Sequence, residues 1–277
     1  MHYALKYAQK YSNDQLVELL LKNGANPNLA NEEGFTPLHI TCKEFCRFWR
    51  ASAALEAFFE TNRELGQLVQ VDARDNSGRT PLQLAVEGPD PRLVDVLLDN
   101  GADLSNFVFP TELSTKTFWH KIFEAPVLRE SGKLILASDL LAVADCLEKR
   151  GYELDRSDAM KIMKVFAKYE VFRSADLDQS WYNDEVFASE AKKITIKDED
   201  PNFSLFDLIR LRPEEAAKKF TYSDYLKFAD TMIFKYLSDV SHDLCLIHLR
   251  EKLSRRFFRR WALDSFLKLT RYRLPIL

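Results

Sequence analysis

Histidine and cysteine side chains fall at helical spacing in two places, a pattern that would suit a zinc site on one face of a helix. The two triplets are His39, Cys42 and Cys46, and His242, Cys245 and His248. A zinc site needs three or four converging ligands, and no fourth ligand accompanies the first triplet. For the second triplet, a structural thiol with two partly exposed imidazoles is the favoured interpretation. We therefore expect no metal and no cofactor.

Known catalytic motifs are missing from the sequence. It contains no G-x-S-x-G, H-E-x-x-H, P-loop or G-x-G-x-x-G pattern. Five of the eight glycines occupy turns of the repeats described below, at positions 24, 34, 78, 101 and 151. The adjacent carboxylates of Glu32 and Glu33 are expected at an exposed hairpin tip, where water solvates them. We expect that the protein is not an enzyme.

A basic segment near the C-terminus allows two interpretations. Residues 250–273 carry nine lysines and arginines against two acids. The pattern consists of two i,i+4 arginine pairs interleaved with or followed by aromatic residues: Arg255–Arg259, Arg256–Arg260, Phe257, Phe258 and Trp261. Such a helix would bind nucleic acid or an anionic surface. We favour the alternative, an amphipathic helix that packs its aromatics inward and pairs its arginines with acids of the same chain.

The whole composition describes a globular chain of 277 residues. Hydrophobic residues make up 46%, and the net charge is −3, which excludes extensive disorder and does not suggest a polyanion binder. Four cysteines are too few for a disulfide scaffold. The longest apolar runs of about five residues are too short to span a membrane, and the first residues lack the pattern of a signal peptide. We expect a cytoplasmic protein, with the nucleus also open.

Two short motifs recur along the first hundred residues. Asn23-Gly24-Ala25-Asn26 returns at 100–103, and Gly34-Phe35-Thr36-Pro37-Leu38 returns at 78–82. Gly24 and Gly101 are 77 residues apart, and Thr36 and Thr80 are 44 apart. Both intervals fit a period of about 33 residues if one insertion of about 11 residues lies within 45–70. We expect this insertion to be mostly helical.

Each residue of the motif has a physical role. Gly34 suits the positive φ angle of a tight hairpin, Thr36 is placed to cap the next helix, and Pro37 fits the first helical position. Their counterparts lie 44 residues later. Gly24 and Gly101 are predicted to end helices in the left-handed conformation.

With these motifs, residues 1–104 resemble ankyrin repeats. The resemblance implies an all-α solenoid of about three repeats, the first incomplete, with Met1-His2-Tyr3-Ala4 in place of its usual start. It also implies that His39 joins neighbouring turns by hydrogen bonds, a position at which the third repeat has Gln83.

A solenoid offers a long curved surface suited to protein partners. We therefore expect a non-enzymatic protein–protein interaction adaptor whose target is unknown. The expected contacts are the hairpin tips and the adjoining helices: Asn31, Glu32, Glu33, Phe35, Asn76, Ser77 and Arg79.

The rest of the chain is predicted to be helical. Residues 105–200 form a connector in which Cys146 to Leu154 echo a degenerate repeat, followed by a helix that Ser157 or Asp158 would cap. Residues 201–277 form a last helical domain, with helices that open at Ser204, at Arg212-Pro213 and at Thr221.

This last domain resembles the PRANC domain, which follows ankyrin repeats in poxvirus proteins and occurs in parasitoid wasps and their symbionts. The resemblance is carried by residues 204–216, 253–264 and 271–277. It implies an F-box-like end that recruits the Skp adaptor of a cullin–RING ubiquitin ligase. Only the start of that segment is present here, as Leu274, Pro275, Ile276 and Leu277.

The first prediction concerns the Skp adaptor. Four residues cannot bury the roughly 800 Å² per side that a specific interface needs. We expect that purified Skp adaptor is not captured by this 277-residue chain in reciprocal affinity assays. Capture with micromolar or tighter affinity would contradict this and move the adaptor surface upstream, to the segment 253–269.

Overall fold

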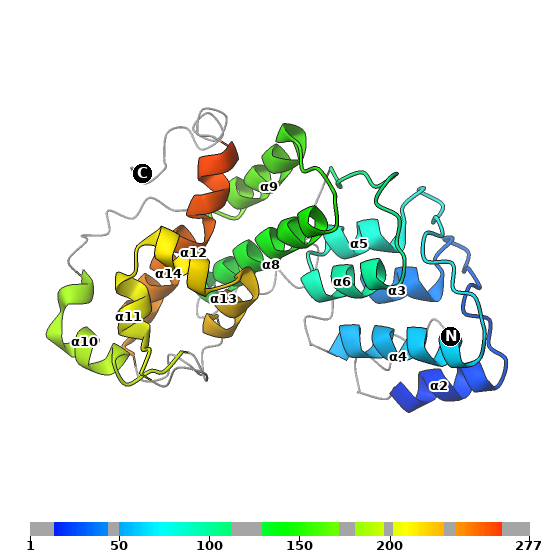
Figure 1. Ribbon diagram of the computed structural model, residues 1–277, viewed down its shortest axis with the longest axis horizontal. Helices are drawn as coiled ribbons and strands as arrows, with labels where there is room; N and C mark the ends of the chain where they lie inside the picture. Colours follow the sequence, from blue (N-terminus) through cyan, green and yellow to red (C-terminus); the bar gives the residue numbers. More distant parts are fainter. Residues whose placement is uncertain are drawn as a thin grey trace. The chain divides into compact units, whose positions relative to one another are not determined.

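The computed structural model describes residues 14–43, 50–111, 129–171, 181–196, 202–229 and 237–261 (Figure 1). In these ranges the regular structure is helical, and the extended backbone is limited to an isolated bridge between Thr195 and Ser204. The expected all-α class is therefore confirmed for the described residues.

The described residues form two compact units. The first contains those up to residue 111 together with 143–154, and the second contains 129–142 and those from 155 onward. The expected domain boundaries after residues 104 and 200 stay predictions.

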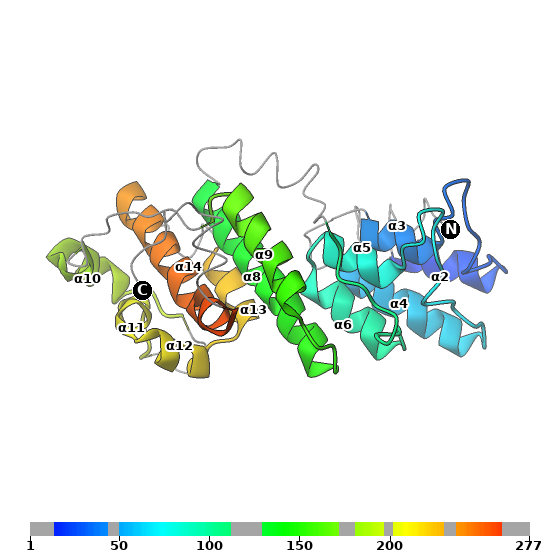
Figure 2. The same ribbon diagram turned by 90° about the horizontal axis from the view of Figure 1, so that it is seen from above.

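The first unit stacks helices in two layers. Its elements are α2 (Asp14–Lys22), α3 (Pro37–Lys43), α4 (Arg50–Glu64), α5 (Pro81–Glu87) and α6 (Pro91–Asp99). In one layer α2, α4 and α6 lie side by side, and in the other α3 packs on α5 (Figures 1 and 2). Leu38, Leu55, Phe58, Ala85 and Leu97 are completely or almost completely buried between the layers. The helix expected within the insertion is confirmed by α4.

Helix starts in this unit follow the sequence signals. At α5 the Thr80 hydroxyl accepts a hydrogen bond from the Gln83 N–H, and the Gln83 side chain accepts one from the Thr80 N–H at 3.0 Å. Pro81 then occupies the first turn, where a missing N–H is harmless. Asp90 caps α6 by accepting the N–H groups of Arg92 and Leu93, and Pro91 occupies the first turn.

Helix ends in this unit use glycines with positive φ. Gly24, Gly66, Gly101 and Gly151 have φ angles of 82°, 64°, 90° and 95°. In each case the residue after the glycine donates its N–H to a carbonyl five residues back, as Ala25 does to Leu20 at 3.0 Å. These are Schellman-type ends, which satisfy carbonyls that the helix leaves open.

Gly66 is the turn glycine that the sequence interpretation missed. Gly34 and Gly66 are 32 residues apart, whereas Gly78 and Gly101 are 23 apart. Gly66 and Gly78 are 12 apart, against ten between Gly24 and Gly34. The insertion is therefore split, with nine residues in the helix pair of the second repeat and two in the loop that follows.

The second unit is also built from helices. Its elements are residues 129–142 of α8 (Arg129–Lys149), α9 (Arg156–Lys168), the short 3₁₀ helix η2 (Trp181–Asn183), α10 (Glu185–Ala191), α11 (Leu205–Arg210), α12 (Pro213–Lys219), α13 (Tyr222–Phe228) and α14 (Asp239–Trp261). The long helix α14 packs against α11, α12 and α13. Its Phe257 and Phe258 are buried against Phe166 of α9, with ring centroids 6.5 and 6.0 Å away.

Most helix starts in the second unit were also predicted. Ser204 and Thr221 are N-caps, each with an aspartate three residues on that completes a capping box, and Pro213 opens α12. The predicted cap of α9 was wrong. Asp155 caps it by accepting from the Asp158 N–H at 2.8 Å, because Ser157 and Asp158 already lie inside the first turn.

Two buried cations anchor α14. The guanidinium of Arg250 is 1% exposed and lies 2.6 Å from the carboxylate of Glu130 in α8. The Lys252 ammonium donates to the carbonyls of Leu208 and Ile209, each at 2.9 Å, and to that of Leu211. A cation at these carbonyls stabilises the C-terminal end of α11, where the helix dipole is negative.

The second prediction compares two glycines with similar φ. A Cβ at Gly34 (φ 79°) would lie 2.5 Å from Asn76 Oδ1 and 2.7 Å from the Asn76 backbone nitrogen, whereas a Cβ at Gly24 (φ 82°) meets no heavy atom within 4 Å. Gly24→Ala should cost about 1–2 kcal/mol, the strain of the left-handed conformation alone. Gly34→Ala should cost roughly 1–3 kcal/mol more, because Asn76 must also move. Urea unfolding measures both, and equal losses would contradict the close approach.

Candidate protein-interaction surface

Each repeat hairpin is organised by one side chain at its base. Asn31 Oδ1 accepts the N–H groups of Glu33 at 3.0 Å and Phe35 at 2.8 Å. Asp75 does the same 44 residues later, with both N–H donors, from Ser77 and Arg79, at 2.8 Å. These turns hold the tips Glu32-Glu33 and Asn76-Ser77 in fixed backbone conformations.

The two hairpin tips are hydrogen-bonded to each other. The Asn76 side chain donates to the Glu32 carbonyl at 2.9 Å, and the Asn76 N–H donates to the Glu33 carbonyl at 3.2 Å. The absence of a side chain at Gly34 is what allows this approach. The tips therefore form one continuous surface across two repeats.

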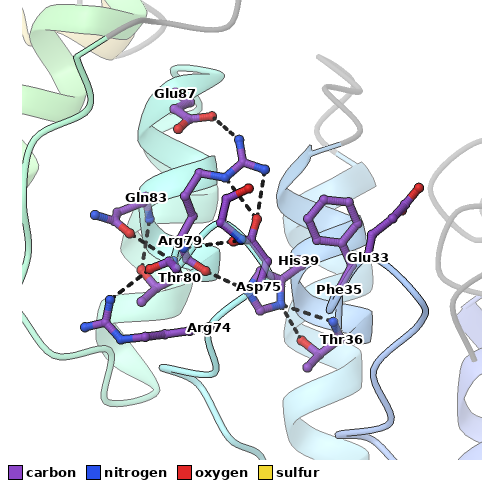
Figure 3. Close-up of polar contacts among 12 residues, drawn as sticks. Glu33, Phe35, Thr36, His39, Arg74, Asp75, Arg79, Thr80, Gln83 and Glu87 are labelled. Carbon is purple, nitrogen blue, oxygen red and sulfur yellow. Dashed lines mark hydrogen bonds and ion pairs between the residues drawn. The ribbon is translucent and has the colours of Figure 1, made fainter.

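His39 joins the same two repeats from below the tips (Figure 3). Its Nδ1 lies 3.1 Å from the Thr36 nitrogen and 2.8 Å from the Thr36 hydroxyl, and its Nε2 lies 3.0 Å from the Arg79 carbonyl. The Thr36 N–H requires an acceptor, so Nε2 carries the hydrogen and donates to Arg79. The role expected for His39 is confirmed. Burial lowers the pKa of this imidazole below its ordinary value.

Gln83 performs the equivalent role in the next repeat. Its side-chain oxygen accepts the Thr80 N–H, and its Nε2 donates to the Val108 carbonyl at 3.3 Å. Val108 thus occupies the place that Arg79 has in the previous hairpin. The Phe109-Pro110 pair that follows aligns with Thr80-Pro81, and Phe109 is 1% exposed. The repeat-to-repeat hydrogen bonding therefore continues beyond residue 104.

A charged network borders the second tip (Figure 3). Arg79 contacts Asp75 at 2.8 Å and Glu87 at 3.3 Å, and Arg74 donates to the Gly78 carbonyl at 2.8 Å. Burial alone would raise the pKa of Asp75, but the hydrogen bonds from the backbone and side chain of Arg79 outweigh it, so the pKa is lowered. Asp75 therefore stays ionised and keeps the hairpin folded.

Exposure separates the predicted contact residues into two groups. Asn31, Glu32, Glu33, Asn76 and Ser77 are exposed, and Arg79 is half-buried. Phe35 is only 4% exposed, and Lys43 lies over its ring at 4.1 Å. We therefore remove Phe35 from the contact set, because its side chain belongs to the repeat core. The other six stay predictions.

The loops below the hairpins carry residues that the sequence interpretation missed. Asn28 donates to the Leu68 carbonyl at 2.7 Å and accepts the Gln70 N–H at 2.8 Å. One repeat later, the Asp72 carboxylate accepts the Asp103 N–H at 3.0 Å. Asn28 and Asp72 are both short polar residues in a loop that follows a turn glycine. This position is the only feature of the sequence that points to their role in joining repeats.

The second histidine–cysteine triplet does not form a metal site, and Cys46 of the first triplet lies outside the described residues. Among the described residues, no group of three or more His, Cys, Asp or Glu side chains is placed to hold a metal ion. His39 uses both ring nitrogens, and burial raises the pKa of the Cys42 and Cys245 thiols. Burial, with Lys252 nearby, lowers the pKa of His248 to about 4 while its Nε2 lies 3.0 Å from the Ile209 carbonyl.

Several predicted residues lie outside the described ranges. They are Met1 to Ala4, Cys46, and Leu274, Pro275, Ile276 and Leu277. Within those ranges, every helix is too short or too polar to cross a membrane.

Comparison with known proteins identifies the first unit. Residues 1–107 match the family model for ankyrin repeats (3 copies). The chain is 30% identical over 95 residues to the human (Homo sapiens) transient receptor potential cation channel subfamily A member 1, covering 34% of this chain and 8% of that protein. It is also 31% identical over 118 residues to a putative ankyrin repeat protein of fowlpox virus (strain NVSL), and this match covers 41% of this chain and 31% of that protein.

The chain thus spans less than a third of the length of either curated relative. Residues 1–107 are ankyrin repeats, and the predicted helical solenoid is confirmed. The family match does not extend to the second unit, so its resemblance to the PRANC domain remains a prediction.

The third prediction tests His39 with Gln83 as its template. His39→Ala should lower the unfolding free energy by about 2 kcal/mol, because the buried Thr36 and Arg79 groups lose their partner. His39→Gln should cost less than about 1 kcal/mol, since an amide bridges the same groups at Gln83. Urea unfolding at pH 7.5 measures both.

Acid should distinguish wild type from His39→Gln. Because burial lowers the folded pKa of His39, the unfolded chain binds the proton first, and stability is lost as pH falls below about 6.5. The glutamine variant should lose less stability between pH 7.5 and 5. If the difference in unfolding free energy between wild type and His39→Gln is the same at pH 7.5 and at pH 5, His39 is not held neutral in the folded protein.

Proposed function

We propose that this protein is a non-enzymatic adaptor that binds a target protein through the hairpin tips of its ankyrin repeats. Ankyrin repeats are protein-binding repeats, and this general role follows from the family match. The observation that supports the specific surface is the hydrogen-bonded pair of tips. Their backbone is fixed by Asn31, Asp75 and His39, while the side chains of Glu32, Glu33 and Ser77 remain exposed.

Preorganisation is what makes this surface suitable for binding. A loop that must order on binding loses conformational entropy, whereas these tips are already held by hydrogen bonds within and between repeats. The exposed acids give the tips a negative charge, so we propose a target with basic groups opposite Glu32 and Glu33. The target itself is unknown.

The second unit is proposed to couple the bound target to another factor. By its resemblance to the PRANC domain it would be a ubiquitin-ligase recruiting module, but the contact with Skp and cullin that the family makes through its F-box-like end is one that we do not expect this 277-residue chain to make. The free thiols of Cys42, Cys146 and Cys245 are in keeping with the proposed cytoplasmic location.

Nucleic-acid binding through α14 is less well supported. Arg250 and Lys252 are buried and bonded within the unit, and Arg259 pairs with Glu214. Phe257 and Phe258 are buried rather than available for stacking. These contacts favour the amphipathic interpretation of the helix over a surface for polyanions.

The fourth prediction tests the tips by quantitative affinity capture. Tagged wild-type chain and the variant Glu32→Lys/Glu33→Lys are incubated with a cell lysate, and captured proteins are compared by mass spectrometry. The variant should lose at least one partner, with recovery reduced about tenfold, because a charge reversal places like charges against the basic target.

The matched control is Glu56→Lys/Glu64→Lys on the exposed side of α4, which makes the same change in net charge. It should capture the same partners as wild type. If the tip variant also retains every partner, the binding surface lies elsewhere on the molecule.

A further inference from the structure

Three cations of the second unit lie over two half-buried phenylalanine rings. Lys192 Nζ is 5.0 Å and the Arg210 guanidinium carbon 5.3 Å from the ring centroid of Phe206. Lys219 Nζ is 5.1 Å from the centroid of Phe203. These five residues, here called the basic–aromatic surface, come from the end of α10, from α11 with the residues before it, and from the end of α12.

The rings are held by the backbone and by the core. The Ile196 N–H donates to the Phe203 carbonyl at 3.2 Å, and the Leu205 N–H donates to the Ile194 carbonyl at 2.8 Å, on either side of Ser204. Phe203 also packs on the buried Phe220, with ring centroids 5.7 Å apart. The positions of Phe203 and Phe206 are therefore set before any partner arrives.

Three carboxylates of α11 and α12 already have partners. Asp207 accepts hydrogen bonds from the Ser204 N–H and hydroxyl, which lower its pKa, with smaller effects from Lys192 and Arg210. Glu215 accepts the Arg212 N–H at 3.1 Å, and Glu214 pairs with Arg259.

The three cations, in contrast, form no ion pair with an acid of the described residues. None of the ion pairs found among the described residues includes Lys192, Arg210 or Lys219. Among the described residues, these three cations thus lie on an aromatic support without forming an ion pair, and the nearby Asp207 accepts its hydrogen bonds from Ser204.

We propose that the basic–aromatic surface binds an acidic peptide segment of a partner protein. Carboxylates form the strongest hydrogen bonds that a guanidinium and an ammonium offer, and the rings align the cations for them. A nucleic-acid base would need a free ring face, but cations already lie over both rings. The rings are also half-buried, which does not suit insertion into a lipid surface.

This proposal does not depend on the ankyrin tips, because all five residues belong to the second unit. It identifies a second surface, with a charge opposite to that of Glu32 and Glu33. Failure of the lysate capture described above would leave it unaffected, since its test uses a defined probe.

The test is fluorescence anisotropy of a fluorescein-labelled polyglutamate peptide titrated with the full 277-residue chain. A polyglutamine peptide of the same length controls for the label and the backbone. We expect binding of polyglutamate only, with weaker binding as salt is raised, because charged contacts near the surface are screened.

Variants locate the binding on the surface. Lys192→Gln/Arg210→Gln should weaken binding about tenfold through the loss of two charge-assisted contacts. Lys164→Gln/Lys218→Gln removes the same charge from exposed positions of α9 and α12, and should change it by less than about twofold. Phe206→Leu keeps an apolar side chain but removes the aromatic face, and should weaken binding about threefold.

Three results would overturn the proposal: no binding of polyglutamate, equal losses in the two double variants, or tighter binding of oligothymidylate or phosphatidylserine vesicles than of polyglutamate. Circular dichroism and the thermal midpoint of each variant check the fold. If Phe206→Leu is unfolded, the two double variants still decide the outcome.

Discussion

The hydrogen bond from His39 to the Arg79 carbonyl is the contact on which the ankyrin unit depends. An ankyrin hairpin is too small to fold by itself, so each repeat must be fixed to its neighbour. The imidazole does this with both nitrogens, one for the cap of its own helix and one for the next hairpin. Gln83 repeats the arrangement with an amide. The placement of the two tips beside each other follows from His39 together with the Asn76 contacts to Glu32 and Glu33, and Gln83 continues the same spacing to Val108.

The second unit relies on a different kind of contact. Arg250, Lys252 and His248 of one helix reach a carboxylate and the carbonyls at the end of α11, and all three side chains are largely buried. Burying cations is costly unless they have hydrogen-bond partners. Here α8 and α11 supply them, with the Arg250 Nε left without one. Basic residues that would suggest a polyanion surface in the sequence therefore serve to join helices.

The two proposed surfaces differ in chemistry. The ankyrin tips present acids on a backbone held by hydrogen bonds, whereas the basic–aromatic surface presents cations held over rings. Both carry exposed charged side chains on a backbone held by hydrogen bonds, and in neither do the described residues form a metal-binding group. This combination suits a protein that brings two different partners together, as an adaptor does.

Local signals were enough to predict the helical class, the ankyrin repeats and most helix starts, because caps, turn glycines and prolines act on the neighbouring backbone. Thr80, Pro81 and Gly101 needed no knowledge of distant contacts. Which side chains are buried depended on tertiary contacts instead: these place the Phe35 ring in the core and pair Arg250 with Glu130, 120 residues away. The tertiary structure also selected Gly66 as the turn that divides the insertion. Burial depends on which segments meet in space, and a local pattern of residue types carries no record of that.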